Sequence, residues 1–154
     1  MNKSIENMLF EISLWMRLLK EKNDIETNSI AKKIITENEL LLLEVISKYN
    51  KLTISELNDK FGVIKLSAIS LMTKKLEKEK GLIVKQRDTK DDRVVVVSLT
   101  NKGKQLLDAI KSRQSARFAL ILDSIQSEQE KKAITEVLER SIEKICEKLG
   151  FPKL

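Results

Sequence analysis

The side chains of this chain that could do chemistry are hydroxyl groups, carboxylates and cations. Histidine is absent and cysteine occurs once, as Cys146. Without histidine the commonest general base is missing, and the usual nitrogen and sulfur ligands of a zinc site cannot be assembled. The sequence also contains no Gly-rich phosphate loop and no serine-nucleophile motif. Catalysis by carboxylates alone stays open as an alternative, but no motif favours it. We therefore expect no metal, no other cofactor and no enzymatic activity, and we look for a binding function.

The excess positive charge lies in the middle third of the chain. The segment from Lys51 to Lys104 contains 13 Lys and Arg against 7 Asp and Glu, and the flanks hold the remaining 16 basic and 16 acidic residues. The net charge of +6 therefore belongs to this segment. A local basic surface is required for binding a polyanion such as DNA, because binding displaces condensed counterions. A solvated surface with a chance imbalance of charge is the alternative.

Two groups of side chains in this segment have the types and spacing for contacts with nucleic acid. One lies on the polar side of a helix expected at about 66–80, opposite an apolar side of Ile69, Met72 and Leu76. The other lies in the charged connection 87–93 between two extended runs. The candidates are Ser67, Ser70, Leu71, Lys74, Lys75 and Lys78 on the helix, and Arg87, Lys90 and Arg93 in the connection. Taken singly, the serines and lysines of the helix are better explained as ordinary solvated residues. Their position on one face, followed directly by the hairpin, favours contact with DNA.

The candidates are expected to play different roles. The cations should mostly contact phosphates, which position a protein without specifying sequence. We expect Arg93 to enter a minor groove, with Arg87 and Lys90 on phosphates. Leu71 can touch thymine methyl groups, which are apolar and exposed in the major groove. A partly covered surface leucine is the alternative for that residue.

The elements that position these residues are expected to be mainly helical. Ser4 can cap a first helix that ends near 23–24, and the stretch 25–35 is either a loop with a short helix or a continuation of the first one. A capping box of Thr36 and Glu39 opens a helix that is apolar over most of its circumference, as in the centre of a core. The first helix carries an apolar stripe of Ile5, Met8, Leu9, Ile12, Trp15, Met16 and Leu19.

A short helix, a tight turn and a second helix follow. Thr53 and Glu56 form another capping box, Phe61 should face inward, and Gly62 can close the short helix in a left-handed conformation. Gly81 ends the second helix, and the extended runs 82–84 and 94–97 form a β-hairpin. This order fits a helix-turn-helix, in which the second helix enters the major groove while the first crosses the backbone.

Two long helices complete the chain. Thr100 caps the first of them, and a third capping box, Ser127 with Glu130, opens the second, which Gly150 and Pro152 terminate. The terminal helices carry apolar stripes too long for one small lobe to cover, so we expect a homodimer. A bundle within the monomer is the alternative.

The segment 91–103, Asp-Asp-Arg-Val-Val-Val-Val-Ser-Leu-Thr-Asn-Lys-Gly, resembles the wing and following helix start of the MarR (multiple antibiotic resistance regulator) family. The family pattern is Asp-x-Arg, three residues, Val or similar, one residue, Leu-Thr, two residues, Gly. Upstream, the resemblance covers about 36–107 and includes Thr53 to Leu57, Ser67, Ser70, Leu76-Glu77 and Gly81-Leu82-Ile83. Lys65 departs from the Ser or Thr that commonly opens the recognition helix, and Leu71 replaces a residue that is often polar. Base preference therefore cannot be transferred from relatives.

The resemblance implies a triangular homodimer in which the N-terminal and last two helices interlock and hold two winged lobes over a pseudo-palindromic operator. It also implies repression that a small ligand relieves, and it makes Asp91 the residue expected to orient the wing. The family that the chain resembles includes peroxide sensors with a reactive cysteine near the N-terminal helix. The position of Cys146 does not fit that role, and we expect it to be a small buried hydrophobe. Trp15 and Met16 fit core or a dimer interface better than an effector pocket.

We therefore predict a mainly α fold with a small β-hairpin. A winged helix-turn-helix lobe at 36–100 lies between an N-terminal helical dimerisation arm at 1–35 and C-terminal dimerisation helices at 101–154. The predicted function is a sequence-specific DNA-binding transcriptional regulator, a ligand-responsive repressor acting as a homodimer. Because acidic and basic residues interrupt the N-terminal apolar residues and no long apolar span follows, we expect a cytoplasmic protein. A winged-helix module that binds another protein without specific DNA binding is the alternative.

Overall fold

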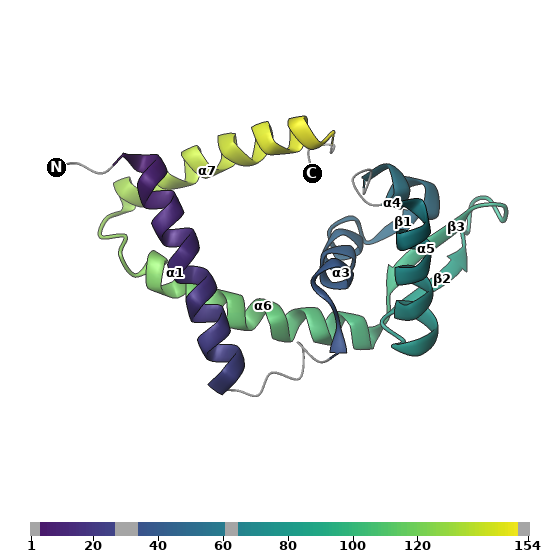
Figure 1. Ribbon diagram of the computed structural model, residues 1–154. Coiled ribbons are helices and arrows are strands. Elements are labelled where there is room, and N and C mark those ends of the chain that lie inside the picture. The colour runs from purple at the N-terminus through teal and green to yellow at the C-terminus, as the bar shows by residue number, and fades with distance from the viewer. Residues whose placement is uncertain (1–3, 27–33, 61–64, 151–154) are drawn as a thin grey trace.

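The computed structural model describes residues 4–26, 34–60 and 65–150, and it confirms the mainly helical fold with a small sheet (Figure 1). The predicted positions of Phe61 and Gly62, and most of the stretch 25–35, lie outside these residues. The elements are α1 (Ile5–Glu26), α3 (Glu37–Tyr49), β1 (Lys51–Thr53), α4 (Ile54–Lys60), α5 (Leu66–Lys74), a π-helical turn η1 (Lys75–Glu79), β2 (Ile83–Arg87), β3 (Val95–Leu99), α6 (Asn101–Leu122) and α7 (Glu128–Leu149).

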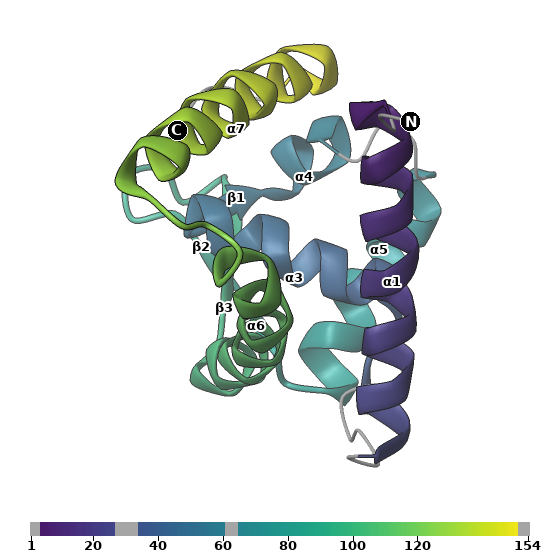
Figure 2. The same cartoon turned by 90° about the vertical axis from the view of Figure 1, so that its left-hand side faces the viewer.

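The chain divides in space into a lobe and a set of three long helices, α1, α6 and α7, which we call the frame. The lobe contains α3, α4, α5 and the sheet, and α6 leads away from it toward α1 and α7 (Figure 1). Helix α1 packs on α6, and Lys20 of α1 forms an ion pair of 3.5 Å with Glu37 at the start of α3. Viewed from the frame side, α5 and the hairpin lie behind α1, α6 and α7 (Figure 2). The lobe therefore presents α5 and the hairpin on the side away from the frame.

The sheet has three antiparallel strands in the order β1-β3-β2, so the prediction of a two-stranded hairpin was incomplete. The added strand β1 pairs with β3 through Leu52 opposite Val97 and Thr53 opposite Val96. Leu52 and Val97 are both buried. The strand is only three residues long and runs directly into the capping box of α4, so it has no alternating pattern of its own.

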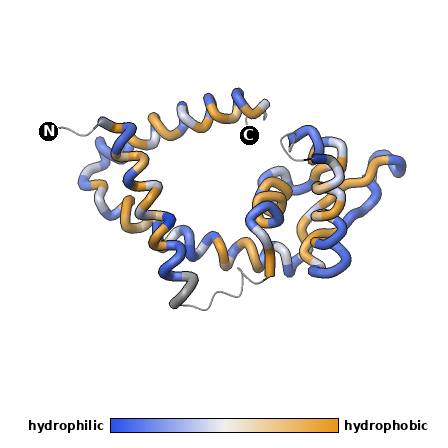
Figure 3. Tube along the Cα trace, viewed as in Figure 1, coloured by the Kyte–Doolittle hydropathy of each residue, from blue (hydrophilic) through white to orange (hydrophobic). Residues whose placement is uncertain are grey.

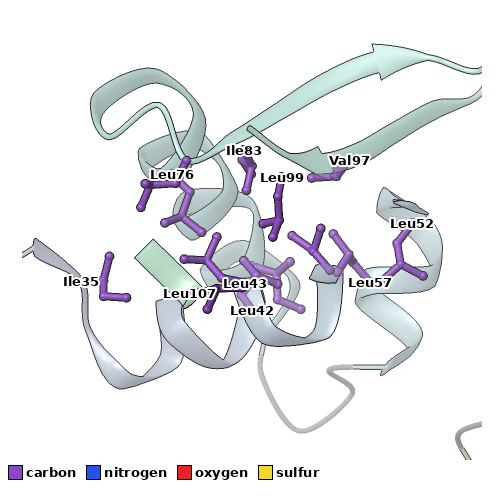
Figure 4. Packing of buried hydrophobic residues seen from close by; sticks show 13 residues of the cluster. Ile35, Leu42, Leu43, Leu52, Leu57, Leu76, Ile83, Val97, Leu99 and Leu107 are labelled. Carbon is purple, nitrogen blue, oxygen red and sulfur yellow. The ribbon is translucent and has the colours of Figure 1, made fainter. Parts of the chain in front are cut away.

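The core of the lobe lies between α3 and the sheet. Leu42, Leu43 and Ile46 of α3 are completely buried, which confirms that this helix is central. Figure 4 shows side chains from several elements converging on α3. The buried partners from the rest of the lobe and from α6 are Ile35, Leu52, Leu57, Ile69, Leu76, Leu82, Ile83, Val97, Leu99 and Leu107.

Most predicted helix starts are confirmed by their hydrogen bonds. Thr36 and Glu39 bond reciprocally, at 3.2 and 2.8 Å, and Thr53 with Glu56 does the same at 3.0 and 2.7 Å. The bonds from Thr53 hold the pKa of Glu56 below its ordinary value. The third box was half wrong: Ser127 accepts from the Glu130 N–H, but the Glu130 carboxylate accepts from the N–H of Gln126 instead. Helix α1 runs to Glu26, slightly beyond its predicted end.

The frame helices expose their apolar stripes in the single chain. Helix α7 buries none of its residues, and hydrophobic positions recur along α1 and α7 (Figure 3). The chain therefore does not form a bundle that covers these stripes within the described residues. The exposed large apolar side chains of α1 and α7 include Ile5, Leu9, Ile12, Trp15, Leu138, Ile142, Ile145 and Leu149. Cys146 is half-buried, whereas the sequence predicted a buried residue. Among the described residues, none of the helices combines the length and the hydrophobicity that a membrane span requires.

Candidate nucleic-acid interface

Helix α5 and the turn η1 form one rod with a buried and an exposed side. Ile69 and Leu76 are buried against the core, and the Thr73 hydroxyl, also buried, donates to the Ser70 carbonyl at 3.0 Å. All six predicted contact residues of the rod are exposed: Ser67, Ser70, Leu71, Lys74, Lys75 and Lys78. The structure thus places these six side chains where a macromolecule can reach them.

The start of α5 is compatible with an approaching anion. Its N-cap, Lys65, makes no side-chain capping bond, and the first turn contains no acidic residue. The amides of Ala68 and Ile69 both donate to the Lys65 carbonyl, at 2.9 and 3.2 Å. Because a helix N-terminus carries partial positive charge, an entry turn without carboxylates favours phosphate nearby.

The second half of the predicted helix is not α-helical. From Lys75 to Glu79 the chain forms the π-helical turn η1, in which the Lys80 N–H donates to the Lys75 carbonyl at 3.0 Å. A π-helical turn contains more residues than an α-helical one, so the simple angular pattern fails beyond Lys74. Lys78 nevertheless remains exposed.

A partly buried ion pair holds the end of this rod. The Lys80 ammonium lies 2.6 Å from the Glu39 carboxylate, and the Glu39 side chain is only 4% exposed. The same carboxylate oxygen accepts from the Thr36 N–H at 2.8 Å, so Glu39 caps α3 and anchors η1 together. Burial alone would raise the pKa of Glu39, but the bonds from Lys80 and Thr36 outweigh it and lower that pKa. Sequence reasoning found Glu39 as a cap and missed Lys80, its partner across 41 positions.

The first turn of α6 closes on the same place. The Lys102 ammonium donates to the Lys80 carbonyl at 2.9 Å, and the Thr100 hydroxyl donates to the Gly81 carbonyl at 2.7 Å. Gly81 has φ +63°, which confirms its predicted role in ending the helix. Gly103 lies so close to the Leu82 carbonyl that a Cβ there would be 2.1 Å from the oxygen. The C-terminal end of the rod is therefore fixed to both α3 and α6.

The wing tip between β2 and β3 presents Arg93. One Asp91 carboxylate oxygen accepts from the Arg93 N–H at 3.0 Å and from its Nε at 3.2 Å. The Arg93 side chain is still 92% exposed. Lys90 is exposed as well. The structure thus brings Asp91 and Arg93 together in the arrangement expected of a wing-orienting residue, while their role on DNA stays a prediction.

The base of the wing is braced by groups that sequence reasoning assigned differently or missed. Arg87, predicted to contact phosphate, uses Nη1 to donate to the Asp92 carbonyl at 3.1 Å, although its side chain is exposed. The Lys51 ammonium of β1 bonds to the Asp88 carboxylate at 3.4 Å. Desolvation raises the pKa of Asp88, but Lys51 and nearby backbone amides bring it below its ordinary value. The contact from Lys51 to Asp88 could not be predicted, because the sequence did not predict strand β1.

The rod and the wing pack against each other in one lobe. Strand β2 packs on η1, and Lys85 of β2 forms an ion pair of 3.7 Å with Glu77 of η1. Both lie on the side of the lobe away from α1 and α7 (Figures 1 and 2). A helix for a major groove and an arginine-tipped ribbon for a neighbouring minor groove are the parts that a winged helix uses on duplex DNA.

Comparison with known proteins identifies relatives of the chain. The family model for the transcriptional regulator SarA/Rot matches residues 19–110. The HTH-type transcriptional repressor MdtR of Bacillus subtilis is 31% identical over 128 residues, covering 82% of this chain and 81% of MdtR. An uncharacterised HTH-type transcriptional regulator of Bacillus anthracis is 30% identical and covers 91% of this chain and 93% of its own length.

Solved structures share the fold. The YusO protein of Bacillus subtilis has a TM-score of 0.58 at 28% identity, covering 90% of this chain and 98% of that one. A MepR mutant from Staphylococcus aureus has a TM-score of 0.69 at 19% identity and covers 94% of this chain and 99% of its own.

Proposed function

The chain belongs to the MarR family of winged helix-turn-helix transcriptional regulators, and on that basis we propose that it binds a pseudo-palindromic operator as a homodimer. It is a DNA-binding protein that regulates transcription. In this proposal α5 and η1 lie in the major groove, and the wing lies over the adjacent minor groove. Two half-sites about one helical turn apart match the two lobes of a dimer.

The observation that carries the proposal is Arg93. Its guanidinium is 92% exposed, and Asp91 orients it at the end of a ribbon that packs beside the cationic rod. Narrow A·T-rich minor grooves concentrate negative potential and attract an inserted arginine. The exposed ammonium groups of Lys74, Lys75 and Lys78 supply phosphate contacts for the neighbouring major groove.

The frame helices support the dimer. Monomeric soluble proteins rarely expose continuous apolar surface of the extent that α1 and α7 carry here. A two-fold interface between copies would cover the stripes on both, including half-buried Cys146.

We further propose that the chain represses transcription, that a small ligand relieves the repression, and that the protein binds without catalysing a reaction. Repression is supported by the relative whose name is that of a repressor. Ligand response rests on the family resemblance, and no residues are assigned to an effector pocket. We place the protein in the cytoplasm because its relatives are bacterial and a bacterial chromosome lies there.

The test begins with selection of bound fragments from random DNA, followed by affinity measurements with Arg93→Ala. Losing a charge-assisted contact should weaken operator binding about 30-fold. Helical content and oligomeric state should be unchanged, because the side chain is exposed. Arg140→Ala on α7 removes an exposed arginine of the frame and should leave affinity as it is. Unchanged affinity in Arg93→Ala counts against the wing assignment.

A further inference from the structure

Leu71 is a large apolar side chain on the exposed side of α5. Leu71 is 55% exposed, and among the lobe side chains that the structure describes, at 34–60, 65 and 67–100, no other large apolar one is as exposed. The sequence left open a partly covered surface leucine. Because more than half of Leu71 is accessible, the neighbouring side chains of the same chain do not bury it.

Leu71 is surrounded by groups that suit DNA better than a protein partner. Ser67 lies one turn before it and Lys74 one turn after it, at helical spacings of four and three residues that share a face. Lys75 follows at the end of α5 and is also exposed. Cations around a single leucine attract a polyanion, whereas the apolar stripes of the frame are continuous. The occupant that matches this patch is the edge of a base beside its phosphates.

Resting on the proposed function, we propose that Leu71 is a specificity-determining residue that contacts the C5-methyl group of a thymine in each half-site. Thymine alone among the four bases presents a methyl group in the major groove. A leucine side chain has no donor or acceptor, so it cannot bond to guanine, adenine or cytosine edges. Covering those polar edges with leucine would leave their hydrogen-bonding groups unsatisfied, which is unfavourable. Leu71 therefore selects thymine both by contact and by exclusion.

The experiment replaces each thymine of the selected operator, one at a time, by deoxyuridine, which lacks only the methyl group. Loss of one buried methyl should weaken binding of the wild-type protein roughly fourfold at the position that Leu71 contacts. Leu71→Ala should bind the thymine operator more weakly, and the same deoxyuridine substitution should then have no further effect. Fragments selected by Leu71→Ala should lose the thymine preference at that position only.

The matched control is Leu41→Ala, which removes another exposed leucine, on α3, and should reproduce the wild-type deoxyuridine profile. The inference is overturned if no thymine is sensitive to the methyl group, or if the sensitive position stays sensitive in Leu71→Ala. Either result leaves operator binding by the wild-type protein intact. Failure of the wild-type protein to select any sequence would instead refute the proposed function together with this inference. Leu71→Ser provides a second variant with the same expected profile.

Discussion

Gly103 ends the segment 91–103 that resembles the family's wing motif, and the geometry around it explains why this position is a glycine. The first turn of α6 approaches the chain after η1 so closely that the Leu82 carbonyl occupies the place of a side chain at position 103. The motif residue Thr100 caps the same turn by accepting from the Gly103 N–H at 3.1 Å. Together they let α6 start directly against the exit of the recognition rod.

Gly103→Ala should therefore destabilise the protein by about 3 kcal/mol, because backbone atoms must move to admit the new Cβ. Denaturation by urea at fixed protein concentration measures the free energy of unfolding. Gly81→Ala is the matched control, because a Cβ added at Gly81 would have nothing within 4 Å. Only the positive φ of Gly81 should then lower the free energy of unfolding, by about 1 kcal/mol. Equal losses in the two variants would show that the close approach at Gly103 is unimportant.

Glu39 makes stability depend on pH in a predictable direction. Its folded pKa lies below the ordinary value of 4.5, so its contribution is fully present above that pH and is lost as pH falls through the folded pKa. Glu39→Gln should cost about 2 kcal/mol at pH 7, since it removes the carboxylate charge that strengthens the hydrogen bond from Lys80. The variant should also lose less stability than the wild type between pH 5 and pH 3, roughly the range over which carboxylates titrate.

Thermal unfolding of both proteins across this pH range measures the difference. Glu37→Gln is a suitable control, since Glu37 lies on the same helix with a side chain that is 91% exposed. Its pH dependence should match that of the wild type closely. Parallel curves for the wild type and Glu39→Gln would contradict the assigned role of the buried carboxylate.

At the scale of elements, the recognition rod should act through charge. Lys74 ends α5, Lys78 lies in η1, and both are exposed. Lys74→Gln and Lys78→Gln should each weaken operator binding and reduce the slope of log affinity against log salt concentration by about one for each lost phosphate contact. The relative preference among operator sequences should change little, because phosphate contacts carry no sequence information directly.

Affinity measured at several salt concentrations tests this prediction. Lys132→Gln removes an exposed lysine from α7 and should leave the slope unchanged. If Lys132→Gln reduces the slope as much as Lys74→Gln does, the effect is one of overall charge, and the assignment of the rod to the groove loses its support.

Elements with strong local patterns could be predicted, and those that depend on distant partners could not. The apolar circumference of α3 and the capping residues Thr36 and Thr53 identified their helices correctly. Strand β1 was missed because its three residues become a strand only by pairing with β3. The turn η1 was missed because sequence spacing does not reveal its contacts with distant residues. One of these is the hydrogen bond from Lys80, directly after η1, to Glu39.

The candidate site was predicted by the same kind of signal. The exposed side of α5 follows from helical periodicity, and the structure places all six rod candidates on the surface. Arg87 was interpreted only as a phosphate contact because its bond to the Asp92 carbonyl depends on how the tip folds. Lys102, which no binding pattern singled out, turns out to join the frame helix α6 to the end of the rod.

At the scale of the whole molecule, the proposed dimer predicts the effect of a charge on the α7 stripe. Ile145 lies in that stripe and is 58% exposed in the single chain. Ile145→Glu would bury a carboxylate in an apolar interface without a partner, so we expect the dimer to dissociate at micromolar concentration. A monomer engages one half-site at a time, and operator affinity should fall about 100-fold or more with loss of the linked second site.

Sedimentation velocity and operator titration measure the two effects. Gln129→Glu places the same side chain on an exposed position of α7 outside the stripe and should leave both unchanged. Ile145 is not part of the buried core of the lobe, so Ile145→Glu should retain its helical content and its weak, salt-dependent affinity for a single half-site. A variant that stays dimeric would show that the stripe is not the interface. A variant that becomes monomeric yet keeps full operator affinity would show that the two lobes do not act together on DNA.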